Sequence, residues 1–277
     1  MPRVPGRSAP ARPPPARRRS GKCDCSARLV SLCPNFMVLL HHCKWSAKTA
    51  RSCRMVFEAQ VQILPLLLPL GDRVLLIRFA DAFDVRANRR AIAAAALLAA
   101  RPVPGVTEIV PNLVSVAVHY DPDRMSFAAL SGEIALALER AGDDPAAAAT
   151  HTIPIRYGGP HGPDLEDVAG QLGMAPGQFI AAHAKSRLRV LAIGFAPGFA
   201  YCGLHAPQLH IQRRTTVRPS VPAGSILFAA GQTAIAATPI RTGWSVIGHT
   251  DFANFDPART PPTRLQPGDA IVFEAVS

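Results

Sequence analysis

The chain has 277 residues, 48% of them hydrophobic, which suffices for one large or two small globular domains. Its net charge of +11 arises from residues 1–54, where 12 basic residues stand against a single acid, and the remainder holds 18 residues of each sign. Because a nucleic-acid-binding domain carries positive charge on its folded surface, this balanced body argues against a nucleic-acid partner.

The first 54 residues are predicted to be a disordered extension, or a segment upstream of a true start at Met55. Their apolar run Leu29–Leu40 lacks the small-residue cleavage site of a signal peptide. Five of the six cysteines lie in this extension, but their spacing to its histidines matches no standard zinc site. With only Cys202 in the body, we expect a reduced, cytoplasmic protein. The run Val61–Leu70 is too short to cross a membrane, which predicts no membrane partner.

Regular elements begin at residue 73. An Ala- and Leu-rich run predicts a helix at 84–100 capped by Asp84, and a second helix is predicted at 126–141 with Ser126 as its cap. Runs rich in β-branched residues predict strands at 73–79, 106–110, 113–120 and 151–157. The resulting order, βαββαβ, predicts a ferredoxin-like domain over residues 55–157.

Residues 158–277 have a different pattern. Asp164 is predicted to cap a helix that ends near residue 172, and a helix at 176–184 and a strand at 189–193 are expected next. From residue 194 onward, Gly and Pro punctuate short apolar runs, which is typical of a β-rich barrel with shaped loops. We therefore predict an α+β protein whose second domain, 158–277, is a β-barrel.

The loop 194–199 is the first candidate for a binding site. It places Phe195 and Phe199 around Pro197 and Gly198, so that a ligand can approach bare backbone between two aromatic rings. The same residues also suit an apolar plug at the mouth of the barrel, and the sequence favours neither interpretation.

Three arginines, Arg213, Arg214 and Arg218, lie within six residues beside a proline. Their planar forks of donors suit a carboxylate or phosphate, so an anion site is favoured over a solvated, charged strand.

Uncharged polar groups and one histidine follow. Gln232 and Thr233 offer the amide and hydroxyl that recognition of a lactam needs, although either could instead bond to local backbone. His249 can transfer a proton near neutral pH or serve a structural role. The body contains no nucleophile elbow and no Cys/His metal spacing, so Ser225 is a poor nucleophile candidate and no bound cofactor or metal is expected.

These features together resemble the family that contains the B subunit of 5-oxoprolinase and the sporulation kinase inhibitor KipI. Its members are also labelled allophanate hydrolase subunit 1 and are similar to half of the carboxyltransferase domain of urea carboxylases. The resemblance runs from about Gly71 to Phe273. Its motifs are Gly71-Asp72-Arg73, Asn88-Arg89, Gly105-Val-Thr-Glu108, Tyr120-Asp121-Pro122, Tyr157-Gly-Gly159, Gly162-Pro-Asp-Leu165, the 194–199 loop, Val221-Pro-Ala-Gly-Ser225, Gly231-Gln232-Thr233, Gly243-Trp244, Gly248-His249-Thr250 and Pro267-Gly-Asp269.

The resemblance implies a ferredoxin-like N-terminal domain followed by a cyclophilin-like β-barrel. It implies a subunit that pairs with a homologous carboxyltransferase-like subunit and with an ATP-using subunit. Together these would open the lactam of 5-oxoproline to glutamate, with ATP used by the partner and no cofactor bound by this chain. His249 and Arg218 would carry catalysis. The residues expected to bind substrate are Phe195, Pro197, Gly198, Phe199, Tyr201, Arg214, Gln232 and Thr233.

Several positions depart from the family pattern. The usual Tyr is Ala236, the usual Gly is Ala234, and the Pro expected before the paired arginines is Gln212. Because a cleft tyrosine would supply a donor and a wall, two alternatives stay open. One is a KipI-like inhibitor that binds a sensor histidine kinase. The other is a subunit of an allophanate- or urea-type amidohydrolase.

Overall fold

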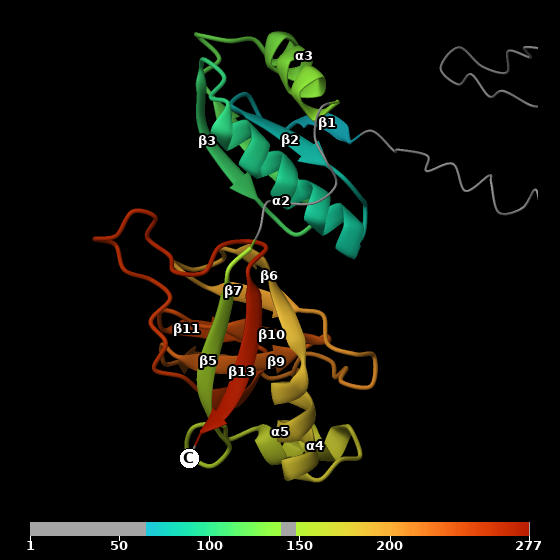
Figure 1. The fold of residues 1–277 in the computed structure, drawn as a ribbon, viewed down its shortest axis with the longest axis vertical. Helices are drawn as coiled ribbons and strands as arrows, with labels where there is room; N and C mark the ends of the chain where they lie inside the picture. The colour runs from blue at the N-terminus through green and yellow to red at the C-terminus, as the bar shows by residue number, and fades with distance from the viewer. Residues whose placement is uncertain (1–64, 140–147, 277) are drawn as a thin grey trace, which may run out of the picture. The chain divides into compact units, whose positions relative to one another are not determined.

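The computed structural model describes residues 65–139 and 148–276 (Figure 1). The predicted extension, residues 1–54, lies outside the described residues, as do five of the six cysteines. The sixth, Cys202, is buried and unpaired. In the described ranges, no helix is both long and apolar enough to cross a membrane, and no three His, Cys, Asp or Glu side chains group to hold a metal ion.

The N-terminal part is a four-stranded antiparallel sheet with two helices. The strand order is β1-β2-β4-β3. The elements are β1 (Leu66–Pro69), β2 (Val74–Arg78), α2 (Val85–Ala100), β3 (Val106–Pro111), β4 (Ser115–Tyr120) and α3 (Phe127–Leu138). The alanine-rich face of α2 packs on the sheet, because small side chains such as Ala91 and Ala94 let the helix approach the buried Leu75 and Val118 closely.

Both helix starts were predicted correctly. The Asp84 carboxylate accepts a hydrogen bond from the backbone N–H of Ala87 at 2.8 Å. The Ser126 hydroxyl oxygen likewise accepts a hydrogen bond from the backbone N–H of Ala129 at 3.2 Å. Each bond satisfies one of the amides that a first helical turn leaves unpaired, which is why these side chains fix where the helices begin.

The predicted order βαββαβ is wrong for this sheet. The strand expected at 151–157 is β5 (Thr150–Tyr157), and it pairs with strands of the barrel. The fourth strand of the N-terminal sheet is β1, which the sequence suggested only as a short apolar run. The physical reason is that β5 alternates Ile153 and Ile155 into the barrel core, and its parallel partner comes about 120 residues later. Such a distant partner leaves no local signal.

The C-terminal part is a closed barrel of seven strands in the order β10-β7-β6-β13-β5-β12-β9 (Figure 1). Strands β8 and β11 form a separate two-stranded sheet, and helices α4 and α5 pack against β12 and β13. The remaining elements are α4 (Leu165–Gln171), α5 (Pro176–Lys185), β6 (Arg187–Ile193), β7 (Ala200–Gly203), β8 (Arg218–Val221), β9 (Ser225–Ala229), β10 (Gln232–Ile235), β11 (Ile240–Thr242), β12 (Ser245–His249) and β13 (Ala270–Val276).

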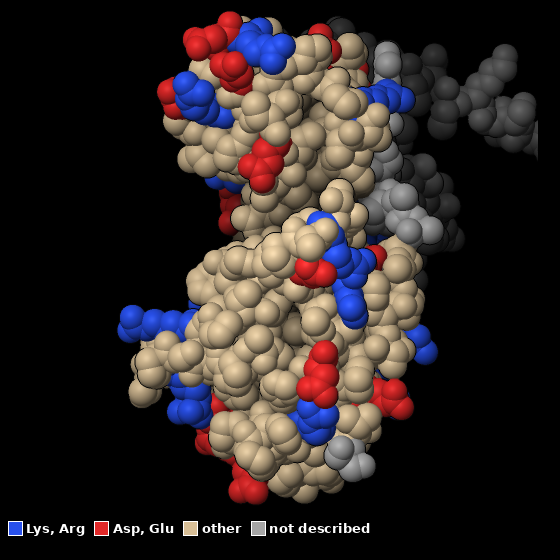
Figure 2. Space-filling model, turned by 90° about the vertical axis from the view of Figure 1, so that its left-hand side faces the viewer, with Lys and Arg blue, Asp and Glu red and all other residues tan. Residues whose placement is uncertain are grey.

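Charged side chains of both signs are spread over the face of the molecule shown in Figure 2. On the face shown in Figure 2, basic and acidic groups stand among uncharged ones without forming one large patch of a single sign. This distribution matches the balanced charge of the chain beyond residue 54.

Candidate functional site

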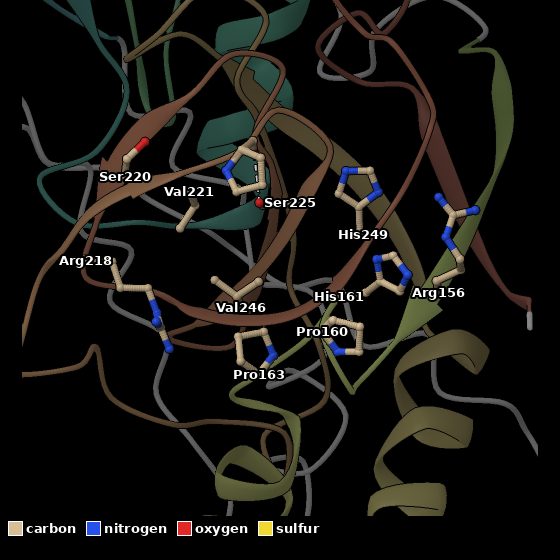
Figure 3. A pocket seen from close by; sticks show the side chains of 11 residues that line it. Arg156, Pro160, His161, Pro163, Arg218, Ser220, Val221, Ser225, Val246 and His249 are labelled. Carbon is tan, nitrogen blue, oxygen red and sulfur yellow. Dashed lines mark hydrogen bonds between the residues drawn. The ribbon is translucent and has the colours of Figure 1, made fainter.

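The first pocket, of about 400 Å³, lies where the loop after β5 meets β8, β9 and β12. We call it the His161–His249 pocket. Its walls are apolar, and its polar groups include Arg156, Arg218 and the two histidines (Figure 3). The two imidazole rings stand 5.9 Å apart, and Figure 3 shows Arg218 across the pocket from them. The structure therefore brings the two predicted catalytic residues, His249 and Arg218, to one cavity.

The imidazole of His249 is oriented by a backbone carbonyl. Its Nε2 donates to the carbonyl oxygen of Ala223 at 3.0 Å, and a carbonyl can only accept. In the neutral ring Nδ1 therefore carries a lone pair, and no described group forms a hydrogen bond with it. The Oδ1 of Asp251 lies 3.8 Å away. Nδ1 is therefore a buried acceptor without a hydrogen-bond partner among the described residues, and it lies beside a carboxylate.

Close packing holds this ring in place. A Cβ atom at Gly224 would lie 2.6 Å from Nε2 of His249 and 2.3 Å from the carbonyl oxygen of Thr250. Gly224 also has a φ of +82°, which side chains disfavour. Only glycine fits here, so Gly224 leaves the space that the imidazole ring of His249 occupies.

A charged pair stands at the edge of the same pocket. Arg156 donates to Asp251 at 2.7 Å, and this hydrogen bond is the main reason that the pKa of Asp251 lies below its ordinary value. The nearby His249 and His161 lower it further. Asp251 is thus a carboxylate at neutral pH, and it would stabilise a proton arriving on His249.

Asp164 has a role that the sequence did not predict. It occupies the N-cap position of α4, but its carboxylate makes no capping bond. Instead Oδ1 accepts from Arg214 at 2.7 Å and from Arg218, while Oδ2 accepts from the backbone N–H of Val246 at 2.8 Å. The predicted N-cap position is confirmed, but its side chain bonds elsewhere, and two of the three candidate anion-binding arginines already share this buried carboxylate. Arg214 also borders a polar hollow of about 330 Å³.

A second pocket, of about 390 Å³, lies beside the 194–199 loop. We call it the Tyr201–Gln232 pocket. Its lining includes Phe195, Tyr201, Arg213, Gln232 and residues 110–113. No hydrogen bond to a described residue occupies the Tyr201 hydroxyl, the Gln232 amide or the Arg213 guanidinium. These three groups are therefore available to a ligand.

The loop that borders this pocket is held rigidly. The exposed Phe195 has a φ of +78°. Its ring packs edge-on against that of the buried Phe199, and the centre of the Phe199 ring lies 4.8 Å from the centre of the Tyr201 ring. Gly198 fits tightly, because a Cβ there would lie 2.5 Å from the Cβ of Phe255. The neighbouring Pro197 is exposed. The loop thus presents one aromatic ring to solvent and uses another as its support.

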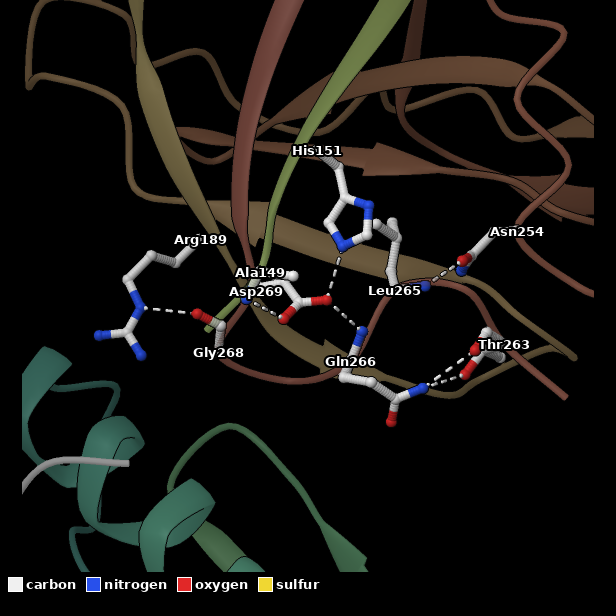
Figure 4. A network of polar contacts seen from close by, with 9 residues as sticks. All are labelled: Ala149, His151, Arg189, Asn254, Thr263, Leu265, Gln266, Gly268 and Asp269. Carbon is white, nitrogen blue, oxygen red and sulfur yellow. Dashed lines mark hydrogen bonds and ion pairs between the residues drawn. The ribbon is translucent and has the colours of Figure 1, made fainter. Parts of the chain in front are cut away.

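The motif at 267–269 links two strands of the barrel. Figure 4 shows the Asp269 carboxylate accepting from Nε2 of His151 at 2.9 Å, from the backbone N–H of Gln266 at 2.9 Å and from that of Ala149 at 3.1 Å. These bonds tie the start of β13 to the start of β5, so Asp269 serves the fold and not a pocket.

Thr233 lies inside the barrel. It belongs to a series of side chains joined by hydrogen bonds, which we call the buried His183–His205 chain. Its hydroxyl is 2.8 Å from Nε2 of both histidines, and its side chain has no exposed surface. The ring of His183 also stacks on that of Phe273 at 5.1 Å. The full chain runs through Tyr157, His183, Thr233, His205 and Ser186 to the carbonyl oxygen of Ala182.

The last hydrogen bond of the buried His183–His205 chain determines which atom carries the proton in every other one. Ser186 donates to a carbonyl, so Nδ1 of His205 must donate to the Ser186 hydroxyl at 2.9 Å. Nε2 of His205 then accepts from Thr233, which in turn accepts from Nε2 of His183. Nδ1 of His183 accepts from the Tyr157 hydroxyl at 2.7 Å. All donors point the same way, and both histidines are neutral.

The surroundings favour these neutral forms. Burial, together with the neighbouring His205, holds the pKa of His183 well below its ordinary value, and burial lowers the pKa of His205 to about 4. Burial also raises the pKa of Tyr157. Protonating either histidine would reverse at least one hydrogen bond of this network, at a site where the histidine side chains are buried.

The family model for the carboxyltransferase domain, subdomain C and D, matches residues 65–265. The chain belongs to this family. Among its relatives, the B subunit of 5-oxoprolinase from Bacillus subtilis (strain 168) is 35% identical over 219 residues, which cover 75% of this chain and 91% of that protein.

Solved structures carry the same fold. The crystal structure of TTHA0988 matches with a TM-score of 0.67 at 35% identity, over 75% of this chain. This chain spans only 40% of TTHA0988. The urea carboxylase of Kluyveromyces lactis matches with a TM-score of 0.59 at 15% identity, over 76% of this chain and 22% of that one, which shows a shared fold.

In this member of the carboxyltransferase family, the predicted site residues fall into separate groups. Arg218 and His249 share one pocket, and Phe195, Tyr201 and Gln232 share another. Pro197, Gly198 and Phe199 lie on the 194–199 loop or support it. Arg214 is hydrogen-bonded to Asp164, and Thr233 is hydrogen-bonded to His183 and His205.

Sequence inspection missed several contributors. His161 and Arg156 line the first pocket, and Arg213 lines the second; Arg213 was one of the three candidate anion-binding arginines, but only Arg214 and Arg218 had been given roles in binding or catalysis. His161 stands in the Gly- and Pro-rich segment 158–163, whose unusual composition was the available signal. No signal distinguished Arg213 from its neighbours, because the difference depends on which arginines reach Asp164.

Proposed function

We propose that this chain is the non-ATP-binding subunit of an ATP-dependent complex that opens 5-oxo-L-proline to L-glutamate. The Bacillus subtilis relative carries the name of a 5-oxoprolinase subunit and is covered to 91% by this chain, which supports a role in a multi-subunit hydrolase. In this proposal a homologous carboxyltransferase-like subunit and an ATP-using subunit complete the complex, and this chain binds no cofactor of its own.

The observation that carries the proposal is the uncommitted polar lining of the Tyr201–Gln232 pocket. The amide of Gln232 can donate and accept at once, which matches the adjacent C=O and N–H of a lactam. The aromatic rings of Phe195 and Tyr201 supply apolar walls for the ring carbons. A cavity of about 390 Å³ suits a small molecule of this kind.

The second part of the proposal concerns His249 and Arg218. Opening a lactam requires that a proton leave the attacking water and that a proton reach the departing nitrogen. His249 and Arg218 line the His161–His249 pocket, so in this proposal the reactant that exchanges protons with His249 binds there, and Asp251 would stabilise the imidazolium that forms. Arg218 would hold an anionic group of the reactants while Asp164 fixes its orientation.

The test is ATP-dependent release of glutamate by a complex reconstituted from this chain and the products of neighbouring genes. Activity should vanish when this chain is omitted. Replacing the proton acceptor, His249→Ala, should lower kcat by about 10²- to 10⁴-fold, the usual contribution of general acid–base catalysis. The matched control His210→Ala, at an exposed histidine, should leave kcat unchanged. Release that proceeds equally well without this chain would refute the proposed function.

A further inference from the structure

The three neighbouring arginines differ in what they contact. Arg214 and Arg218 both donate to Oδ1 of the buried Asp164, so their charges are partly neutralised within the fold. Arg213 makes no ion pair with any described carboxylate. Its guanidinium lies 5.5 Å from the centre of the Trp244 ring. Arg214 and Arg218 share one carboxylate and keep a net positive charge between them, whereas no described carboxylate offsets the charge of Arg213.

The stacking on Trp244 orients Arg213 without using up its donors. A guanidinium over an aromatic ring is attracted through its face, whereas its N–H groups point outward from its edge. Trp244 is itself 6% exposed, so it gives the arginine a fixed support. The side chain of Arg213 is exposed, which keeps the charge accessible from solvent. A planar carboxylate can then bind at the guanidinium edge through two parallel hydrogen bonds.

The position of this charge is specific. Arg213 lines the same pocket as Gln232 and Tyr201. Burial raises the pKa of the Tyr201 phenol, and the nearby charge of Arg213 lowers it again in part. The pocket thus combines a cation at its rim, an amide within it and aromatic walls. A ligand that uses all three is a small organic acid that also carries an amide.

We infer that Arg213 is the residue that selects for a carboxylate on the ligand of the Tyr201–Gln232 pocket. This inference rests on the proposed function and deepens it, because it assigns recognition of the carboxylate to Arg213 in place of Arg214 and Arg218. Arg213 is a specificity-determining residue here and takes no part in bond breaking. Its removal should therefore weaken binding of the acid and leave the chemical step intact.

The experiment compares two cyclic amides in the reconstituted complex: 5-oxoproline and 2-pyrrolidinone, which has the same ring without the carboxylate. KM and kcat are measured for 5-oxoproline, and 2-pyrrolidinone is titrated as a competing ligand. The variants are Arg213→Ala and Arg213→Lys, with Arg187→Ala, at an exposed arginine of β6, as the control for simple loss of charge. Equal urea midpoints for all chains would show that folding is unaffected.

In Arg213→Ala, KM for 5-oxoproline should rise about tenfold, the loss expected for one partly exposed charged hydrogen-bond pair. Its kcat and the inhibition constant of 2-pyrrolidinone should stay unchanged. The lysine variant should recover part of the loss, and Arg187→Ala should behave as wild type. An unchanged KM in an active complex, or an equal loss for both ligands, would overturn the inference. A wild-type complex without activity on 5-oxoproline would instead overturn the proposed function and this inference with it.

Discussion

Acidification from pH 7 to pH 5 should destabilise the barrel through its buried His183–His205 chain. The pKa of His205 lies near 4 in the folded chain, against an ordinary value of 6.5. Unfolding therefore takes up a proton throughout this window, so stability is complete above pH 6.5 and falls as the pH approaches 4. The full difference corresponds to about 3 kcal/mol, at ~1.36 kcal/mol per pH unit. Between pH 7 and pH 5 the loss should be about 2 kcal/mol.

His183 adds a contribution of the same sign, because its pKa is also lowered. The assay is urea unfolding at pH 7, 6 and 5, followed by circular dichroism, with the free energy of unfolding taken from each curve. His205→Gln should be less stable at pH 7 but should lose less between pH 7 and pH 5. The control His210→Gln, at an exposed histidine, should keep the wild-type dependence. A free energy of unfolding that is the same at pH 7 and pH 5 would refute the argument.

Two further predictions concern residues that shape the first pocket. Asp164→Asn should cost about 2 kcal/mol of stability, because two arginines lose a buried partner while their own partial exposure limits the penalty. Asp167→Asn, at an exposed acid of the same helix, should cost little in the same urea assay. Gly224→Ala should cost about 3 kcal/mol or more, since its Cβ would meet the backbone of Thr250. The matched Gly177→Ala, where a Cβ meets nothing within 4 Å, should be neutral or stabilising.

Local signals predicted much of the fold. The starts of α2 and α3 were found because Asp84 and Ser126 bond within one helical turn, so the cause lies beside the effect. The assignment of β5 to the N-terminal sheet failed for the opposite reason. Its alternating pattern shows that it is a strand, but its partner is β13, far along the chain.

The site was predicted less completely, and the reason is again distance in sequence. His249 and Arg218 were expected to act together, and they line one pocket. Thr233 was expected in a cleft, yet its side chain bonds two histidines inside the barrel. Residue type told us that Thr233 could form hydrogen bonds, but its environment depends on β7 and α5 packing around β10, which no motif encodes.

The parallel pairing of β5 with β13 has a consequence for how the protein is made. On the ribosome, β5 emerges about 120 residues before the strand that completes its pairing. At typical elongation rates this interval lasts roughly ten seconds. During that time the edge of β5 that will pair with β13 has no partner and can pair with another chain. A slow codon stretch between these strands, or a substitution that delays β13, would therefore lower the yield of protein without altering any residue of either pocket.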